Sequence, residues 1–145
     1  MIIISDRNYN AILQHALTCL PNEACGLIAG VIEGDKKYIK KVYTLTNLDA
    51  SNEHFSMDPK EQLSTVKDIR YNHLSLLGNF HSHPETPARP SKEDIRLAFD
   101  LKASYLILSL QDRENPVLKA FLIDENMQVT EEIIEIQEVE DYHMR

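Results

Sequence analysis

The stretch 76–94 constrains the fold of this chain more than any other part of the sequence. It starts as an apolar run that ends in His81 and His83, and three prolines follow within residues 84–90. Those prolines prevent regular structure, and Ser91, which comes next, is a residue type that commonly caps the N-terminus of a helix. The sequence therefore predicts a strand, a restricted loop and a helix in direct succession.

The other strands follow from short apolar and β-branched runs that are bounded by turn residues. A turn signal at 33–36 separates two such runs and predicts an antiparallel hairpin. The acidic stretch 131–141 is expected to be a last strand that continues into a frayed tail. Together with the strand before His83, the expected strands are 2–4, 23–30, 38–45, 76–83, 105–110, 117–123 and 128–136.

Three segments have the apolar spacing of helices, with inward positions three or four residues apart. The first begins at Ser5 and Asp6 and ends before Pro21. The second begins at Asp58 and Pro59, which supply a cap and a first-turn proline. The residues expected to face inward are Leu63, Val66 and Ile69 in the second helix, and Ile95, Ala98 and Phe99 in the helix that Ser91 opens.

Composition limits the domain organisation and the partners. With 145 residues, 43% of them hydrophobic, the chain can bury one core, and we expect a single domain over 1–145. A net charge of -8 argues against nucleic acid or an anionic membrane as partner, because both require clustered Lys and Arg. Cys19 and Cys25 suggest neither a disulfide framework nor a CxxC metal pair, so a reducing compartment such as the cytoplasm is expected. The apolar start, residues 1–4, is too short for a signal peptide or a membrane span.

His81 and His83 are two residues apart in a predicted strand. Side chains at this spacing point to the same face, so both imidazoles can reach a common ion. Zinc binds neutral imidazoles well, and Asp94 in the first turn of the following helix can supply a third ligand. A fourth position that stays open is typical of a catalytic zinc site rather than a structural one.

Each half of this pattern also has an ordinary explanation. A pair of histidines can occur by chance, and Ser91 with Asp94 matches a capping box at the start of a helix. The two halves in succession favour a metal site.

The same residues resemble a known motif when one upstream residue is added. His81-Ser-His83-Pro is separated from Ser91-x-x-Asp94 by seven residues, and Glu23 lies far upstream in Glu-Ala-Cys-Gly-Leu-Ile-Ala-Gly. The combination resembles the JAMM motif of the MPN-plus (JAB) metallopeptidases, and the order of elements resembles a short bacterial member over nearly the whole chain. The resemblance implies an α/β fold of one MPN domain, cytidine-deaminase-like, with a curved mixed sheet flanked by three helices.

The resemblance also implies roles for individual residues. His81, His83 and Asp94 would be the zinc ligands, Glu23 the general acid/base and Ser91 a donor to the developing oxyanion. Glu23 has physical support as well, because a carboxylate in an otherwise apolar run is unfavourable when unpaired and is more often functional. Cys25 shares the strand face of Glu23 and is expected to be a small buried residue rather than a ligand.

The function implied by the resemblance is zinc-dependent hydrolysis of a peptide or isopeptide bond. The expected substrate is the C-terminal tail of a ubiquitin-like or sulfur-carrier protein, whose flexible Gly-Gly end can enter a narrow groove. A non-enzymatic MPN scaffold that binds a partner protein is the main alternative, although such relatives typically lose the metal ligands that this chain has. A DNA-repair-associated relative fits poorly with the acidic charge. The sequence does not indicate an oligomeric state.

Overall fold

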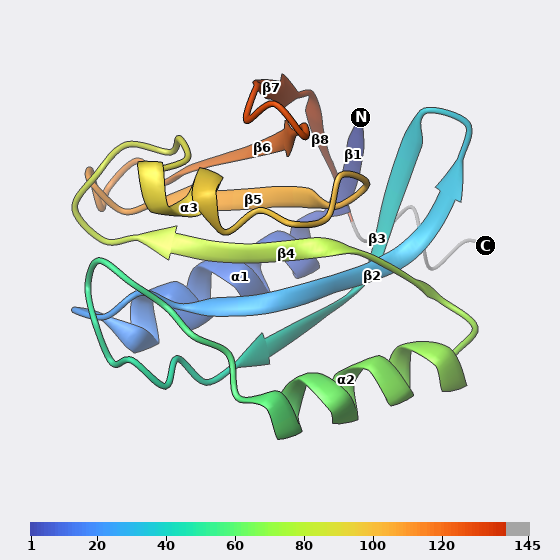
Figure 1. Ribbon diagram of the computed structural model, residues 1–145, viewed down its shortest axis with the longest axis horizontal. Coiled ribbons are helices and arrows are strands. Elements are labelled where there is room, and N and C mark those ends of the chain that lie inside the picture. Colours follow the sequence, from blue (N-terminus) through green and yellow to red (C-terminus); the bar gives the residue numbers. More distant parts are fainter. Residues whose placement is uncertain (139–145) are drawn as a thin grey trace.

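The structure, a computed structural model, describes residues 1–138 and consists of three helices around one eight-stranded sheet (Figure 1). In the sheet β1 runs parallel to β3 and β8, and β4 runs parallel to β5, whereas the other neighbours are antiparallel. The curved mixed sheet with three helices is the architecture expected from the sequence. The elements are β1 (Ile2–Ser5), α1 (Asp6–Cys19), β2 (Cys25–Glu33), β3 (Lys36–Leu45), α2 (Pro59–Tyr71), β4 (Ser75–His83), α3 (Lys92–Arg96), β5 (Ser104–Ser109), β6 (Val117–Ile123), β7 (Val129–Glu132) and β8 (Ile134–Gln137).

The two edge strands of the sheet, β7 and β8, are consecutive in the chain, and only Ile133 separates them. β7 pairs with β6 at one edge and β8 pairs with β1 at the other, so the sheet curls until its edges approach each other. The prediction of one strand over 128–136 is therefore wrong, because no single straight strand could complete both edges. The predicted continuation to residue 141 extends beyond the described residues.

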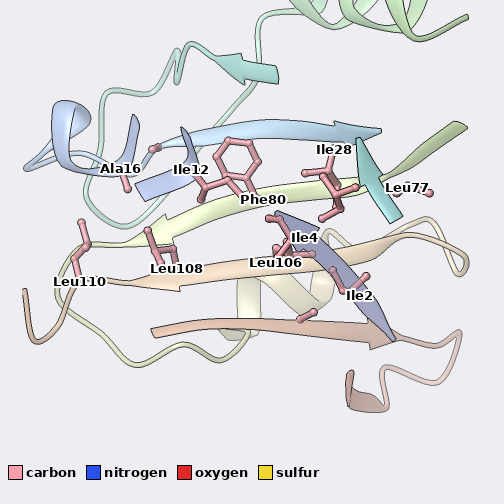
Figure 2. Close-up of a cluster of buried hydrophobic side chains, with 13 residues drawn as sticks. Ile2, Ile4, Ile12, Ala16, Ile28, Leu77, Phe80, Leu106, Leu108 and Leu110 are labelled. Atoms are coloured by element: carbon pink, nitrogen blue, oxygen red, sulfur yellow. The ribbon is translucent and has the colours of Figure 1, made fainter. Parts of the chain in front are cut away.

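The larger hydrophobic core lies between α1 and one face of the sheet (Figure 2). Ile12 and Ala16 of the helix pack in one cluster with Phe80 of β4 and with Leu106 and Leu108 of β5. Burying an aliphatic or aromatic side chain of this size contributes roughly 1.5–3 kcal/mol. The alternate residues of β4 and β5 point away from this core, toward the face on which α3 lies (Figure 1).

The structure corrects the expected inner face of α2. Leu63 was expected to face inward but is 57% exposed, whereas Thr65 and Ile69 are buried. Thr65 and Ile69 are four residues apart and share one side of the helix, while Leu63 lies about 120° around the axis from Ile69 at about 100° per residue. The helix therefore meets β3 and β4 along the side that carries Thr65.

The structure also shortens α3, which ends at Arg96. Ile95 and Ala98 pack against Ala103 and Tyr105, as expected, but Phe99 is 84% exposed. The chain turns after the helix, so Phe99 is not carried to the side that faces the sheet. No helix within residues 1–138 is long and apolar enough to cross a membrane.

Candidate metal centre

The end of β4 presents His81 and His83 on the face of the sheet opposite the α1 core. Both histidines are almost completely buried. Phe80 and Ser82 alternate with them and point to the other face, where Phe80 joins the core. The strand thus positions both imidazoles from its own regular geometry.

Asp94 reaches the same place from the first turn of α3. Its backbone N–H donates to Ser91 Oγ at 3.0 Å, and its Oδ2 accepts from the Ser91 backbone N–H at 2.9 Å. This reciprocal pair is a capping box. The capping box therefore begins the helix and also orients the Asp94 carboxylate toward the histidines.

Three donor atoms converge on one point in this site. His81 Nε2 and His83 Nε2 are 3.2 Å apart, and Asp94 Oδ2 lies 3.1 Å from the first and 3.2 Å from the second. A tetrahedral zinc ion at about 2.0–2.1 Å from nitrogen and oxygen ligands separates neighbouring ligand atoms by about 3.3 Å. The mutual distances of the three atoms therefore fit a zinc ion with one further position open.

The surroundings of the two imidazoles also suit metal binding. His83 Nδ1 donates to the Pro87 carbonyl at 2.9 Å, which leaves the Nε2 lone pair of a neutral ring pointing at the other donors. Phe55 stacks on the His81 ring with 4.7 Å between centroids. His81 Nδ1 is buried and has no hydrogen-bond partner within residues 1–138, so the stacking contact restrains a ring that lacks an outer hydrogen bond.

Charges in the group are strongly coupled. Burial tends to raise the pKa of Asp94, but hydrogen bonds from His81 and His83 outweigh it and hold that pKa well below its usual value. Burial tends to lower the pKa of His83, but its contacts with Asp94 and the Pro87 carbonyl leave it raised. Asp94 is therefore the anionic member of the group, as expected for a carboxylate that pairs with a cation.

Glu23 lies just before β2, and the strand register brings it to the histidines. Cys25 pairs with His81 across the antiparallel strands β2 and β4, so two residues earlier Glu23 comes opposite His83. A carboxylate oxygen of Glu23 and one ring nitrogen from each histidine all lie within 4.8 Å of one another. Residues 58 positions apart in sequence thus form one site.

The Glu23 side chain is buried and poorly satisfied. It is 3% exposed, and its Oε1 has no hydrogen-bond partner within residues 1–138. Burial raises the pKa of Glu23 to about 8, although the charge of His83 opposes this shift. A nearby bound cation would favour the ionised form. The carboxyl is therefore suited to exchange a proton near neutral pH.

Ser91 and Cys25 occupy different positions relative to this group. Ser91 is exposed at the rim, and its Oγ accepts from Asp94, which leaves its hydroxyl hydrogen free to point elsewhere. Cys25 is fully buried in a separate cluster with Leu27 and Leu45. The expectation that Cys25 is a small buried residue is confirmed.

Sequence reasoning missed three contributors to the site. Phe55 lies in a polar, irregular stretch, and the Pro87 carbonyl belongs to the backbone, so neither has a signal in the sequence pattern. Ser82 Oγ accepts from the Ala24 backbone N–H at 2.8 Å, and the Ser82 N–H donates to the Ala24 carbonyl at 3.0 Å. These two hydrogen bonds link the Glu23 segment to β4. The position of Ser82 between the two histidines was the only sequence signal for this role.

A curled mixed sheet with a buried His–His–carboxylate group and a second acid beside it defines a domain of the JAB/MPN class. The chain matches the family described as prokaryotic homologues of the JAB domain over residues 5–124. The chain therefore belongs to this family.

Its relatives include named peptidases. The CysO-cysteine peptidase of Mycobacterium tuberculosis is 30% identical over 138 residues, which are 95% of this chain and 92% of that one. A probable TtuB-protein conjugate cleaving protease of Thermus thermophilus is 33% identical over 79% of this chain and 71% of its own length. The desampylase of Pyrococcus furiosus is 28% identical over 90% of this chain and 86% of that one.

Solved structures agree with the fold. A solution structure of a Desulfitobacterium hafniense protein has a TM-score of 0.90 and 53% identity, and the match covers 100% of this chain and 99% of that one. A JAB1/MPN domain protein from Archaeoglobus fulgidus has a TM-score of 0.59 at 23% identity, covering 94% of this chain and 99% of that one. The second match supports the fold alone.

Proposed function

We propose that this chain is a zinc-dependent peptidase or isopeptidase of the JAMM type. It hydrolyses a peptide or isopeptide bond at the C-terminal tail of a ubiquitin-like or sulfur-carrier protein. The single observation that carries the proposal is the convergence of His81 Nε2, His83 Nε2 and Asp94 Oδ2 at 3.1–3.2 Å, with the buried Glu23 beside them.

Zinc is the metal that this donor set fits best, because two imidazoles and one carboxylate are common ligands of catalytic zinc. His81, His83 and Asp94 would hold it. When bound, zinc supplies a Lewis acid that polarises a carbonyl and makes water nucleophilic at neutral pH. The Pro87 carbonyl would keep His83 in the tautomer that offers Nε2.

Glu23 and Ser91 would carry the steps that belong to the protein. Glu23 would accept a proton from the attacking water and later deliver it to the leaving amine, as a general base and acid does. Its unpaired Oε1 is the atom available for this transfer. The Ser91 hydroxyl at the rim would donate to the oxyanion that develops on the scissile carbonyl.

The substrate class follows from the relatives together with the site. The relatives are named for the removal of cysteine from CysO, the cleavage of TtuB conjugates, and desampylation. Nothing in the charge of the chain favours nucleic acid or an anionic membrane, since the net charge is -8. We place the activity in the cytoplasm, where Cys19 and Cys25 would remain free thiols.

The proposal is tested with carrier proteins whose Gly-Gly terminus is extended by one amino acid or joined to a lysine side chain. The zinc-loaded protein should cut after Gly-Gly, which mass spectrometry of the carrier detects. A chelator should stop the cleavage, and added zinc should restore it. If the zinc-loaded protein binds the carrier stably but cleaves none of the carrier substrates, the proposal is overturned in favour of a non-enzymatic scaffold.

A further inference from the structure

A small pocket borders the metal-donor group on one side. His81 and Asp94 form part of its wall, and its volume is about 60 Å³. Glu23 instead lines a separate cavity together with His15, Cys19 and Asn47. His81 and Asp94 therefore border one hollow, and Glu23 beside them borders another.

The wall of the pocket beyond the donor group is mainly apolar. Its apolar and aromatic side chains come from five parts of the fold, the loop before α2, the loop before α3, the residue after α3, β5 and β6, and they are Phe55, Pro90, Leu97, Tyr105, Ile107 and Ile123. Apart from His81 and Asp94, the lining contains no ionisable carboxylate or ammonium group. An acidic side chain entering the pocket would lose its hydration and meet the like charge of Asp94, and a basic one would meet a carboxylate that is already paired with His81 and His83.

One polar group remains available in this wall. The Tyr105 hydroxyl already donates to the Asp100 carbonyl at 3.1 Å. Asn79 also lines the pocket, and it lies two residues before His81 on the same face of β4. An amide offers both a donor and an acceptor, so Asn79 can orient a peptide group without selecting for charge.

We propose that this pocket is the subsite that receives the small, uncharged side chain of a residue flanking the scissile bond. The proposal rests on the proposed peptidase function and adds to it a rule for substrate choice. The volume is several times the roughly 10–15 Å³ that one water needs, which suits an aliphatic side chain of a few carbon atoms. Because the proposed cut follows Gly-Gly, whose last residue has no side chain, the flanking residue belongs to the leaving-amine side of the bond.

Leu97 is the residue through which the pocket can be changed with little damage to the fold. It lines the pocket yet is 46% exposed, so a polar replacement does not place a charge in the core. Leu101, in the same segment, is 50% exposed but does not line the pocket. Leu101→Asp therefore serves as a matched control for Leu97→Asp.

The activity test uses carrier substrates whose Gly-Gly end is followed, after the cleaved bond, by Ala, Val, Leu, Asp or Lys. The unmodified protein should cleave the Ala or Val substrate at least about tenfold faster than the Lys and Asp substrates. Leu97→Asp should abolish this preference and favour Lys, and Leu97→Ala should shift it from Val toward Leu. Equal rates for all five substrates, or the same change in Leu101→Asp, would overturn the proposal.

A binding test keeps the pocket falsifiable without turnover. Methyl NMR signals of Ile107 and Ile123 should shift on titration with the amide of Gly-Gly-Val but not with that of Gly-Gly-Lys. Leu97→Asp should remove the response, and Leu101→Asp should retain it. If the methyl chemical shifts of Ile107 and Ile123 change with neither peptide, the assignment of the pocket as a subsite is wrong. Failure of the zinc-loaded protein to cleave any carrier would instead count against the proposed function.

Discussion

Two polar clusters can be compared in this protein, the buried donor group at the end of β4 and a partly buried cluster where the curled sheet closes. In the closure cluster Lys37 Nζ donates to Ser104 Oγ at 2.7 Å, and Ser104 Oγ donates to Glu132 Oε1 at 2.6 Å. The Met1 ammonium reaches the other Glu132 oxygen at 3.4 Å. In the donor group, by contrast, Glu23 Oε1 and His81 Nδ1 have no partner within residues 1–138.

The contrast separates a structural cluster from a functional one. Ser104 is fully buried and could not meet a substrate, although its contact with Lys37 has the composition of a Ser–Lys catalytic pair. Its hydrogen bonds join β3, β5 and β7, so the cluster holds the curl of the sheet. The buried Glu23 Oε1, which has no hydrogen-bond partner within residues 1–138, does not link strands in this way, and its burial lowers the stability of the fold. The unsatisfied Glu23 Oε1 therefore marks the place where a ligand would supply the missing partner.

Loss of a metal ligand should have the largest effect on turnover. We expect His81→Ala and Asp94→Ala to lose bound zinc and activity, because two remaining protein ligands hold zinc poorly. Metal analysis after dialysis should give about one zinc per chain for the parent and almost none for the variants. His73→Asn, at an exposed histidine, is the control. Equal zinc in all four proteins would contradict the ligand assignment.

Glu23→Gln should separate catalysis from both metal binding and stability. The substitution keeps shape but removes basicity, so turnover should fall by roughly 10²–10⁴ while zinc is retained. Thermal stability should not fall, because Oε1 has no hydrogen-bond partner among residues 1–138 to lose. The variant should also trap an uncleaved carrier complex, which size-exclusion chromatography can detect. An unchanged rate would assign the proton transfer to another residue.

Ser91→Ala should have a smaller effect on turnover and a measurable effect on stability. Zinc should stay, the rate should fall on the order of a hundredfold, and the lost N-cap should lower the free energy of unfolding by about 1 kcal/mol. Asp58→Ala removes the corresponding cap of α2, away from the site, and should change stability alone. If both variants behave alike, Ser91 is only a cap.

Ser104→Ala should lower stability and leave turnover unchanged, whereas Glu23→Gln should lower turnover and leave stability unchanged. Lys37 and Glu132 would lose their shared partner, and the free energy of unfolding should fall by about 1–3 kcal/mol. Denaturant unfolding of the dialysed proteins measures this difference, and zinc content should equal that of the parent. A loss of activity at full zinc occupancy would show that the closure cluster also serves the site.

The local sequence predicted most of the elements, and it indicated the candidate donor residues without showing that they meet. Three short patterns could be recognised from nearby positions in the sequence. They are His81 and His83 at a spacing of two, Ser91 and Asp94 at a spacing of three, and the carboxylate of Glu23 at the start of an apolar run. Such patterns follow from strand and helix periods, which depend on short-range geometry alone. The strand and helix types were therefore predicted well, while the inward role of Leu63 was not, because it depends on which side of α2 meets the sheet.

Tertiary structure decided what distant residues do together. The pairing of β2 with β4 places Glu23 opposite His83, and the stacking of Phe55 on His81 joins a loop to a strand. The break at Ile133 likewise exists because the curl of the whole sheet brings its two edges together. Register and curvature arise from contacts between segments far apart in sequence, so no local pattern records them. The sequence by itself indicated the candidate donor residues and their elements, and the folded sheet determined the distances that bring their side chains together.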